Sequence, residues 1–168
     1  AGRLSQLVED LLNFSRLEAG TVKLNQWLVP IATIVYELTT QLNTQLKNHR
    51  LLLRMQEQLP PVYIDRDKVK QVIFNLLTNA IKYSPRGGEV GLEIREVAEA
   101  ELPADHPHGR WILIGVSDQG IGIAPEDLAR IWERFYRGDN TNTRRIGGTG
   151  GGWSISRALE ELHGGRIW

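Results

Sequence analysis

Residues 75–85 read Asn-Leu-Leu-Thr-Asn-Ala-Ile-Lys-Tyr-Ser-Pro, and they close a stretch that we expect to be helical over residues 66–83. On a helical wheel the apolar residues of this helix form one broad arc. Four polar side chains lie along or beside its edge: Asn75, Asn79, Lys82 and Tyr83. An unpaired buried amide costs about 1–3 kcal/mol, so both asparagines need partners. They could cap loop backbone, or their oxygens could complete a Mg²⁺ shell shared with phosphates. This stretch alone leaves both interpretations open.

A second motif, Asp118-Gln-Gly-Ile-Gly122, follows an apolar run at residues 111–116 that we expect to be a strand. A buried carboxylate at a strand end usually bonds backbone or an amine. The glycines Gly120 and Gly122 permit positive φ and the close approach of a flat ligand. An aspartate that accepts a hydrogen bond from the exocyclic amine of adenine would explain both features. As a dinucleotide-binding fingerprint the motif fails, because its third glycine is missing.

Two further motifs complete the series. The aromatic and basic segment 135–137, Phe-Tyr-Arg, leads into a polar loop. Five of the six residues at 147–152 are glycine, and a predicted helix at about 152–162 begins where they end. Backbone amides at a helix N-terminus bind anions, although a glycine cluster can also be a merely flexible loop. It is not a Walker loop, because no Lys-Ser or Lys-Thr pair follows.

The other segments indicate the fold class. We expect strands at 22–28, 50–56, 89–97 and 111–116, and helices at 1–18, from residue 30 to about 46, and at 126–131. Asp65 is placed to cap the helix at 66–83, and residues 98–109 are an expected exposed hairpin loop. Segregated helices and mostly antiparallel strands predict an α+β fold. Its architecture would be a two-layer α/β sandwich, with a mixed, mostly antiparallel sheet and helices on one face.

The first 18 residues carry an apolar seam at three- and four-residue steps: Leu4, Leu7, Leu11 and Phe14, with Val8 and Leu12 beside it. Such a seam favours packing against another helix, and the alternative is a helix that covers its own domain. Because the helix is already under way at residue 1, we expect the chain to be a piece of a longer protein.

The composition excludes several classes. Of 168 residues, 41% are hydrophobic, and 20 basic side chains balance 20 acidic ones. This balance argues against a nucleic-acid partner. Cysteine is absent, which excludes disulfides and thiolate zinc sites. No apolar stretch approaches the roughly 20 residues of a membrane span. The sequence is compatible with a cytoplasmic location, alone or as the cytoplasmic part of a membrane-anchored sensor.

Together the motifs resemble the catalytic, ATP-binding domain of bacterial two-component sensor histidine kinases, within the gyrase, heat-shock-chaperone, kinase and mismatch-repair ATPase superfamily. Residues 75–85 resemble the N box, 118–122 and 147–152 the two glycine boxes, and 135–137 the F box. Residues 10–20 resemble the end of the dimerisation and phosphoacceptor helix. The resemblance implies a Bergerat-type fold. Residues 1–20 would end the dimerisation helix, and 21–168 would be the kinase domain, cut short before its last strands.

The resemblance also implies roles by position. Asn79 would be the main Mg²⁺ ligand with Asn75 beside it, and Tyr83 would pack near the adenine. Asp118 would bind the adenine amine, with Gly120 and Gly122 shaping that wall.

Lys82 and Arg137 would be the catalytic cations, Lys82 on phosphate and Arg137 near the γ-phosphate. Residues 138–148 would form a mobile lid. The remaining ATP-binding residues would be Gly147, Gly148, Thr149, Gly150 and Gly152.

The implied activity is transfer of the γ-phosphoryl of Mg-ATP to a histidine on the dimerisation domain, from which a response regulator takes it, within a homodimer. The family's acceptor histidine lies in an earlier helix, and His49, His106, His108 and His163 lack that context. We therefore expect no autophosphorylation of this chain alone.

Two rival functions remain open at this point. A switch ATPase of the same superfamily would need a carboxylate base in the helix at 66–83, and none occurs between Asp67 and Glu89. A nucleotide-binding pseudokinase draws on Gly151 and Trp153, where the family usually has leucine. Trp153 would either refill the space inward or be forced over the cleft. We expect the second outcome, with a disordered or displaced lid and with ATP binding weaker than in a Gly151→Leu, Trp153→Leu double mutant.

Overall fold

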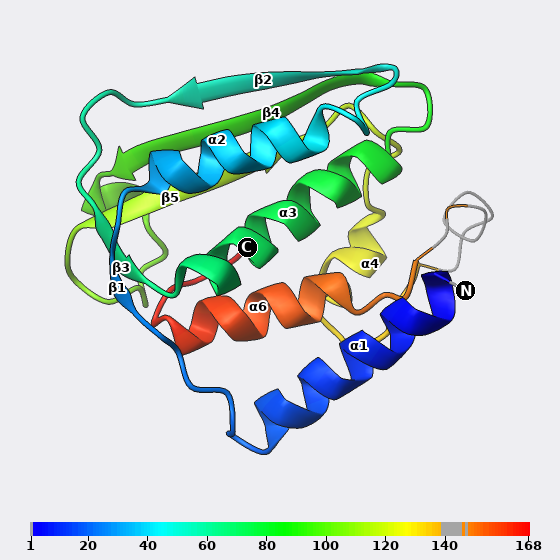
Figure 1. Cartoon of the computed structure of the whole chain (residues 1–168), viewed down its shortest axis with the longest axis horizontal. Coiled ribbons are helices and arrows are strands. Elements are labelled where there is room, and N and C mark those ends of the chain that lie inside the picture. The colour runs from blue at the N-terminus through cyan, green and yellow to red at the C-terminus, as the bar shows by residue number, and fades with distance from the viewer. Residues whose placement is uncertain (1, 139–145, 147) are drawn as a thin grey trace.

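The computed structural model describes residues 2–138, 146 and 148–168 (Figure 1). Its main sheet has the strand order β2-β4-β5, with β2 (His49–Met55) parallel to β4 (Gly88–Val97) and β5 (Trp111–Ser117) antiparallel to it. A separate ribbon pairs β1 (Trp27–Val29) with β3 (Val62–Ile64). The mixed sheet and the helices beside it confirm the predicted α+β class with its two-layer architecture.

Helices lie on one face of the sheet (Figure 1). Among the described residues these helices are α1 (Gly2–Glu18), α2 (Ile31–Leu42), α3 (Arg66–Lys82), α4 (Pro125–Leu128) and α6 (Gly152–Leu162), and a short 3-10 helix, η1 (Glu99–Glu101), follows β4 in the chain. The central helix α3 contacts α2, both β4 and β5, and α6, whereas α1 packs on α6. A site between α3, α6 and β5 is therefore built around α3, the helix that contacts both of the other elements.

Two apolar clusters hold these layers together. The larger one joins α2, α3 and the sheet, and its fully buried side chains include Leu38, Leu77 and Leu92. The smaller one, around Phe14 and Ile155, joins α1, α3 and α6. Both α3 and α6 thus bury apolar side chains in a core. Close packing of these side chains fixes the position of the two helices, and with them the position of their polar residues.

Local signals located the central helices well. Asp65 caps α3 by accepting a hydrogen bond from the Lys68 backbone N–H at 3.2 Å, and α6 spans the predicted residues. The strand expected at 22–28 is shorter, because the Asn25 N–H donates to the Asp65 carboxylate (2.9 Å) instead of a sheet partner. The helix expected to reach residue 46 ends at Leu42, where weak helix formers follow the last buried turn.

The seam predicted along the first helix divides between two faces. Leu4 and Leu11 are exposed, with 70% and 59% of their surface accessible, whereas Phe14 is buried against α3 and α6. Helix α1 therefore does cover its own domain with one face, and Phe14 does not belong to the outward stripe. Within the described residues, no helix is long and apolar enough to cross a membrane.

Candidate functional site

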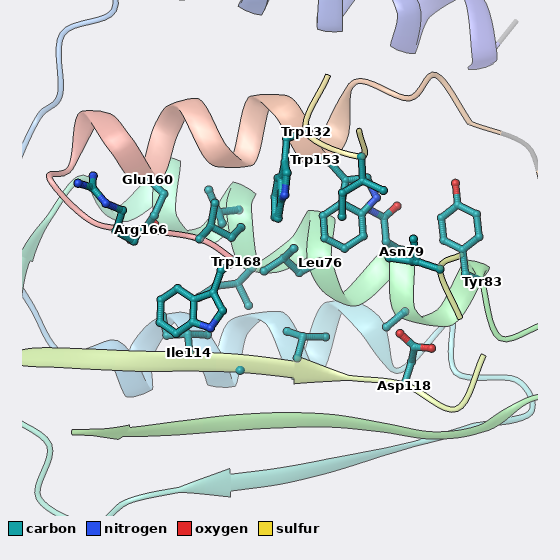
Figure 2. Close-up of a pocket in the computed structure, with 18 of the residues that line it drawn as sticks. Leu76, Asn79, Tyr83, Ile114, Asp118, Trp132, Trp153, Glu160, Arg166 and Trp168 are labelled. Atoms are coloured by element: carbon teal, nitrogen blue, oxygen red, sulfur yellow. The ribbon is translucent and has the colours of Figure 1, made fainter. Parts of the chain in front are cut away.

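A cavity of about 420 Å³ lies between the helices α3 and α6 and the strand β5. Figure 2 shows Asn79, Tyr83 and Asp118 toward one end, and Glu160, Arg166 and Trp168 toward the other. Six of the site residues predicted from the sequence line it: Asn79, Tyr83, Asp118, Gly122, Arg137 and Gly150. Residues from four separated segments thus converge on one cavity.

Asp118 follows directly after β5, and its Oδ1 accepts a hydrogen bond from the Gly120 N–H at 2.8 Å. Its side chain is exposed, not buried as a strand-end carboxylate was expected to be. A Cβ on Gly120 would collide with the Tyr83 carbonyl oxygen, which also accepts from the Ile121 N–H at 2.9 Å. Gly120 is therefore needed for close approach, and this contact holds Asp118 beside the end of α3.

The asparagines Asn75 and Asn79 lie half-buried on α3 and face the first residue of α6. A Cβ on Gly152 would lie 3.9 Å from Asn79 Nδ2 and 4.0 Å from Asn75 Cγ. Across the described ranges, neither side-chain amide has a hydrogen-bond partner, so the predicted capping of loop backbone is not seen. Their oxygens remain available to a ligand.

This donor set fits Mg²⁺ only with help from a ligand. In the part of the chain that the structure describes, no group of three or more His, Cys, Asp or Glu residues could hold a metal ion. Magnesium commonly keeps one or two protein oxygens and completes its shell with phosphate and water oxygens. Asn75 and Asn79 match that requirement in donor type, and Asn79 is the one of the two that lines the cavity.

Lys82 lies between the aromatic ring of Tyr83 and the glycine segment. Its Nζ is 3.3 Å from the Tyr83 hydroxyl and 4.6 Å from the ring centroid. Gly148 has φ +145°, a backbone conformation that favours glycine, and a Cβ there would meet the same ammonium. The structure therefore places Lys82 beside Gly148 of the second glycine motif.

The F-box segment is anchored by a polar cluster. The Tyr136 hydroxyl donates to Asp127, and this hydrogen bond, helped by burial, raises the pKa of Tyr136. The Arg130 guanidinium stacks 4.1 Å from the Tyr136 ring centroid. Arg137 lines the cavity, and its Nη2 donates to the Ile146 carbonyl oxygen at 2.7 Å. The anchored neighbour holds Arg137 at the cavity wall.

The second glycine motif packs against this segment. Gly150 has φ +77°, and a Cβ there would lie 2.8 Å from the Tyr136 carbonyl oxygen. The Thr149 hydroxyl donates to Asp10 of α1. Gly147 and most of the expected lid lie outside the described residues, so the prediction of a displaced lid stays a prediction.

Comparison with known proteins agrees with this arrangement. Residues 64–168 match the family model described as histidine kinase-, DNA gyrase B- and HSP90-like ATPase. The chain belongs to this family. Its domain is the catalytic ATP-binding domain of the sensor histidine kinase type.

The relatives are sensor kinases. The chain is 35% identical over 170 residues to the sensor histidine kinase WalK of Bacillus subtilis, covering 99% of this chain and 26% of that protein. It is 30% identical over 166 residues to the sensor protein kinase WalK of Staphylococcus aureus, covering 99% and 38%. The chain thus spans about a quarter to two fifths of these relatives.

A solved structure shares the fold. The crystal structure of full-length ShkA in complex with AMPPNP superposes with a TM-score of 0.74 at 26% identity, covering 94% of this chain and 30% of that one. Because 94% of this chain is covered, the similarity includes at least part of the 17-residue helix α1.

The two residues at which the sequence differs from the usual leucine of the resembled motif, Gly151 and Trp153, have defined surroundings. Trp153 lines the cavity and packs edge-on against Trp132, with ring centroids 5.6 Å apart. It is therefore directed at the cleft, as expected from the sequence. Gly151 is buried, and a Cβ there would lie 2.7 Å from Asp10 Oδ2.

Sequence reasoning missed part of this kinase-type site. Asp10 contacts the glycine motif, Trp132 forms one wall, and the cavity continues to Glu160 and Trp168. Burial raises the pKa of Glu160, although His163 opposes the shift. None of these residues stands in a local pattern that signals a site, because tertiary packing brings each of them to its place.

Proposed function

We propose that this chain is the kinase module of a sensor histidine kinase, binding Mg-ATP and presenting its γ-phosphoryl to a histidine on a dimerisation domain. The observation that carries the proposal is the convergence of Asp118, Asn79 and Arg137 on one cavity, with Lys82 at its border. The crystallised ShkA, a similar structure, holds the ATP analogue AMPPNP, which supports a nucleotide as the ligand here.

The cavity offers different chemistry to the two ends of the nucleotide. Asp118 would accept a hydrogen bond from the adenine amine, with Gly120 and Gly122 forming the wall beside it. Tyr83, at the C-terminal end of α3, would pack near the base. An aspartate acceptor selects a base that carries an amine at that position, and so favours adenine.

Cations and oxygen ligands surround the phosphate end. Asn79 and Asn75 would hold Mg²⁺, which when bound shields the phosphate charge. Lys82 and Arg137 would add positive charge near the phosphates. The amides of Gly147, Gly148, Thr149, Gly150 and Gly152 would complete the cradle. Phosphoryl transfer depends mostly on positioning and charge neutralisation, which this set could supply without an acid-base dyad.

The acceptor and the partners belong to the longer protein in this proposal. The exposed stripe of α1, which includes Leu4 and Leu11, would pack against a partner helix in a homodimer. The phosphoryl group would pass from the dimerisation domain to a response regulator. A cytoplasmic location of the domain stays a prediction. A switch ATPase is not favoured, because the relatives are kinases and α3 carries no carboxylate after Asp67.

Calorimetric titration with ATP, with and without Mg²⁺, tests the proposal. The wild-type chain should bind ATP more tightly with Mg²⁺. Asn79→Ala should lose mainly the Mg²⁺-dependent part, because it removes a proposed ligand oxygen. Asn43→Ala, at the exposed end of α2, is the matched control and should bind like the wild type. Absence of ATP binding, or an Mg²⁺ effect unchanged in Asn79→Ala, would contradict this assignment.

A further inference from the structure

A buried carboxylate of α1 contacts the glycine motif. Asp10 is only 5% exposed, and its Oδ2 accepts a hydrogen bond from the Thr149 hydroxyl. Its Oδ1 accepts from Gln6 Nε2 at 3.0 Å. Helix α1 therefore reaches the proposed phosphate-binding segment through a charged side chain rather than through apolar packing alone.

The contact extends to the start of α6. The Gly151 N–H donates to Thr149 Oγ1 at 3.2 Å, and Thr149 in turn donates to Asp10. No side chain caps α6 directly, so this relay serves one of its N-terminal donors. The positive end of the helix also favours a nearby carboxylate. Two donors that could turn toward phosphate are thus occupied: the Thr149 hydroxyl by Asp10, and the Gly151 N–H by Thr149.

The contact with Asp10 favours glycine at position 151, whereas the backbone conformation there does not demand it. Gly151 has φ −85° and ψ −25°, which any residue can adopt. A Cβ there would lie 2.7 Å from Asp10 Oδ2 and 3.1 Å from Asp10 Cγ. Glycine, which stands where the resembled motif usually has leucine, therefore leaves room for the Asp10 carboxylate.

Further along α1, two more side chains contact the segment at residues 134–135. Phe14 packs against Phe135 with ring centroids 5.3 Å apart, and Glu18 pairs with Arg134. These residues flank the F-box segment, which contacts Gly150. Docking of α1 consequently constrains both segments that border the phosphate end.

We propose that Asp10 makes an autoinhibitory contact: docked α1 holds Thr149 and, through it, the Gly151 N–H, in competition with nucleotide phosphates. Phosphate binding then favours release of Asp10, and release of Asp10 favours phosphate binding by the same factor. The competition rests on the proposed nucleotide site, whereas the Asp10–Gly151 complementarity does not.

A nucleotide-free double-mutant cycle tests the complementarity. Gly151→Ala should lower the melting temperature and speed proteolysis of the connection at residues 19–26, because the new methyl group displaces Asp10. In the Asp10→Ala background the same Gly151→Ala change should lower the melting temperature clearly less. Additive effects of the two changes would overturn the assignment, since contacting residues should couple.

Nucleotide titration of the whole chain tests the competition. Asp10→Asn should bind Mg-ATP about fivefold more tightly than the wild type, a typical coupling, and bind adenosine equally. Glu9→Gln removes the same charge from an exposed neighbour and should leave both affinities unchanged. Equal or weaker ATP binding in Asp10→Asn would overturn the competition. If neither the wild type nor any variant binds ATP, the proposed function is wrong. The nucleotide-free double-mutant cycle still tests the contact between Asp10 and Gly151 in that case.

Discussion

Replacing Asp118 by asparagine tests base recognition most directly. The two carboxylate oxygens of Asp118 have different tasks in the structure. Oδ1 accepts the hydrogen bond of the Gly120 N–H at 2.8 Å, which leaves Oδ2 for the adenine amine. Asparagine has one acceptor oxygen, so it can serve the Gly120 N–H or the base, but not both.

The expected loss follows from this geometry. If the amide oxygen stays on Gly120, its NH₂ group faces the adenine NH₂ group, two donors without an acceptor. Loss of a hydrogen bond to a charged group costs about 1.5–3 kcal/mol, or roughly 10- to 100-fold in Kd. Because Asp118 is solvent-exposed without ligand, we expect the lower part of this range.

Isothermal titration calorimetry with ATP and ADP measures the effect. The affinities for ATP and ADP should fall equally in Asp118→Asn, since the base is common to both nucleotides. The melting temperature should stay near that of the wild type. Glu57→Gln also removes one negative charge, from the exposed connection between β2 and β3, and serves as control. Wild-type affinity in Asp118→Asn, or a loss for ATP but not for ADP, would refute the reasoning.

Two other outcomes can be measured with the same protein. Incubation with labelled ATP should leave no acid-labile phosphate on the chain, because no histidine has the acceptor context, and His163 already has both ring nitrogens in hydrogen-bond contacts. A stable phosphohistidine on the isolated chain would contradict this, and supplying a dimerisation domain in trans is the positive control. Trp153→Leu should tighten ATP binding, because it removes an indole from the cavity. It should also lower the melting temperature by about 2–4 °C if the pair with Trp132 contributes about 1 kcal/mol. Weaker ATP binding would show that Trp153 belongs to the site, and Trp27→Leu, on the exposed ribbon, controls for loss of an indole elsewhere.

Much of the fold was predictable because its signals are local. The cap at Asp65, the periodic apolar arc of α3 and the glycines before α6 lie within a few residues of the structure they specify. The same locality explains why Asn75, Asn79 and Lys82 were found along one helix edge. Predictions failed where no local signal exists: the alternation at residues 22–26 found no strand partner, and the apolar pattern continued beyond Leu42 after the helix had ended.

The sequence by itself therefore determined the two-layer α/β class, the central helices and the residue types that face the cavity, since helical and turn chemistry depend on near neighbours. Only the tertiary structure decided that β2 runs parallel to β4, that Phe14 turns inward, and that Asp10 lies against Gly151. These features depend on contacts between distant segments. Their energy comes from packing that becomes available only when both segments are in place.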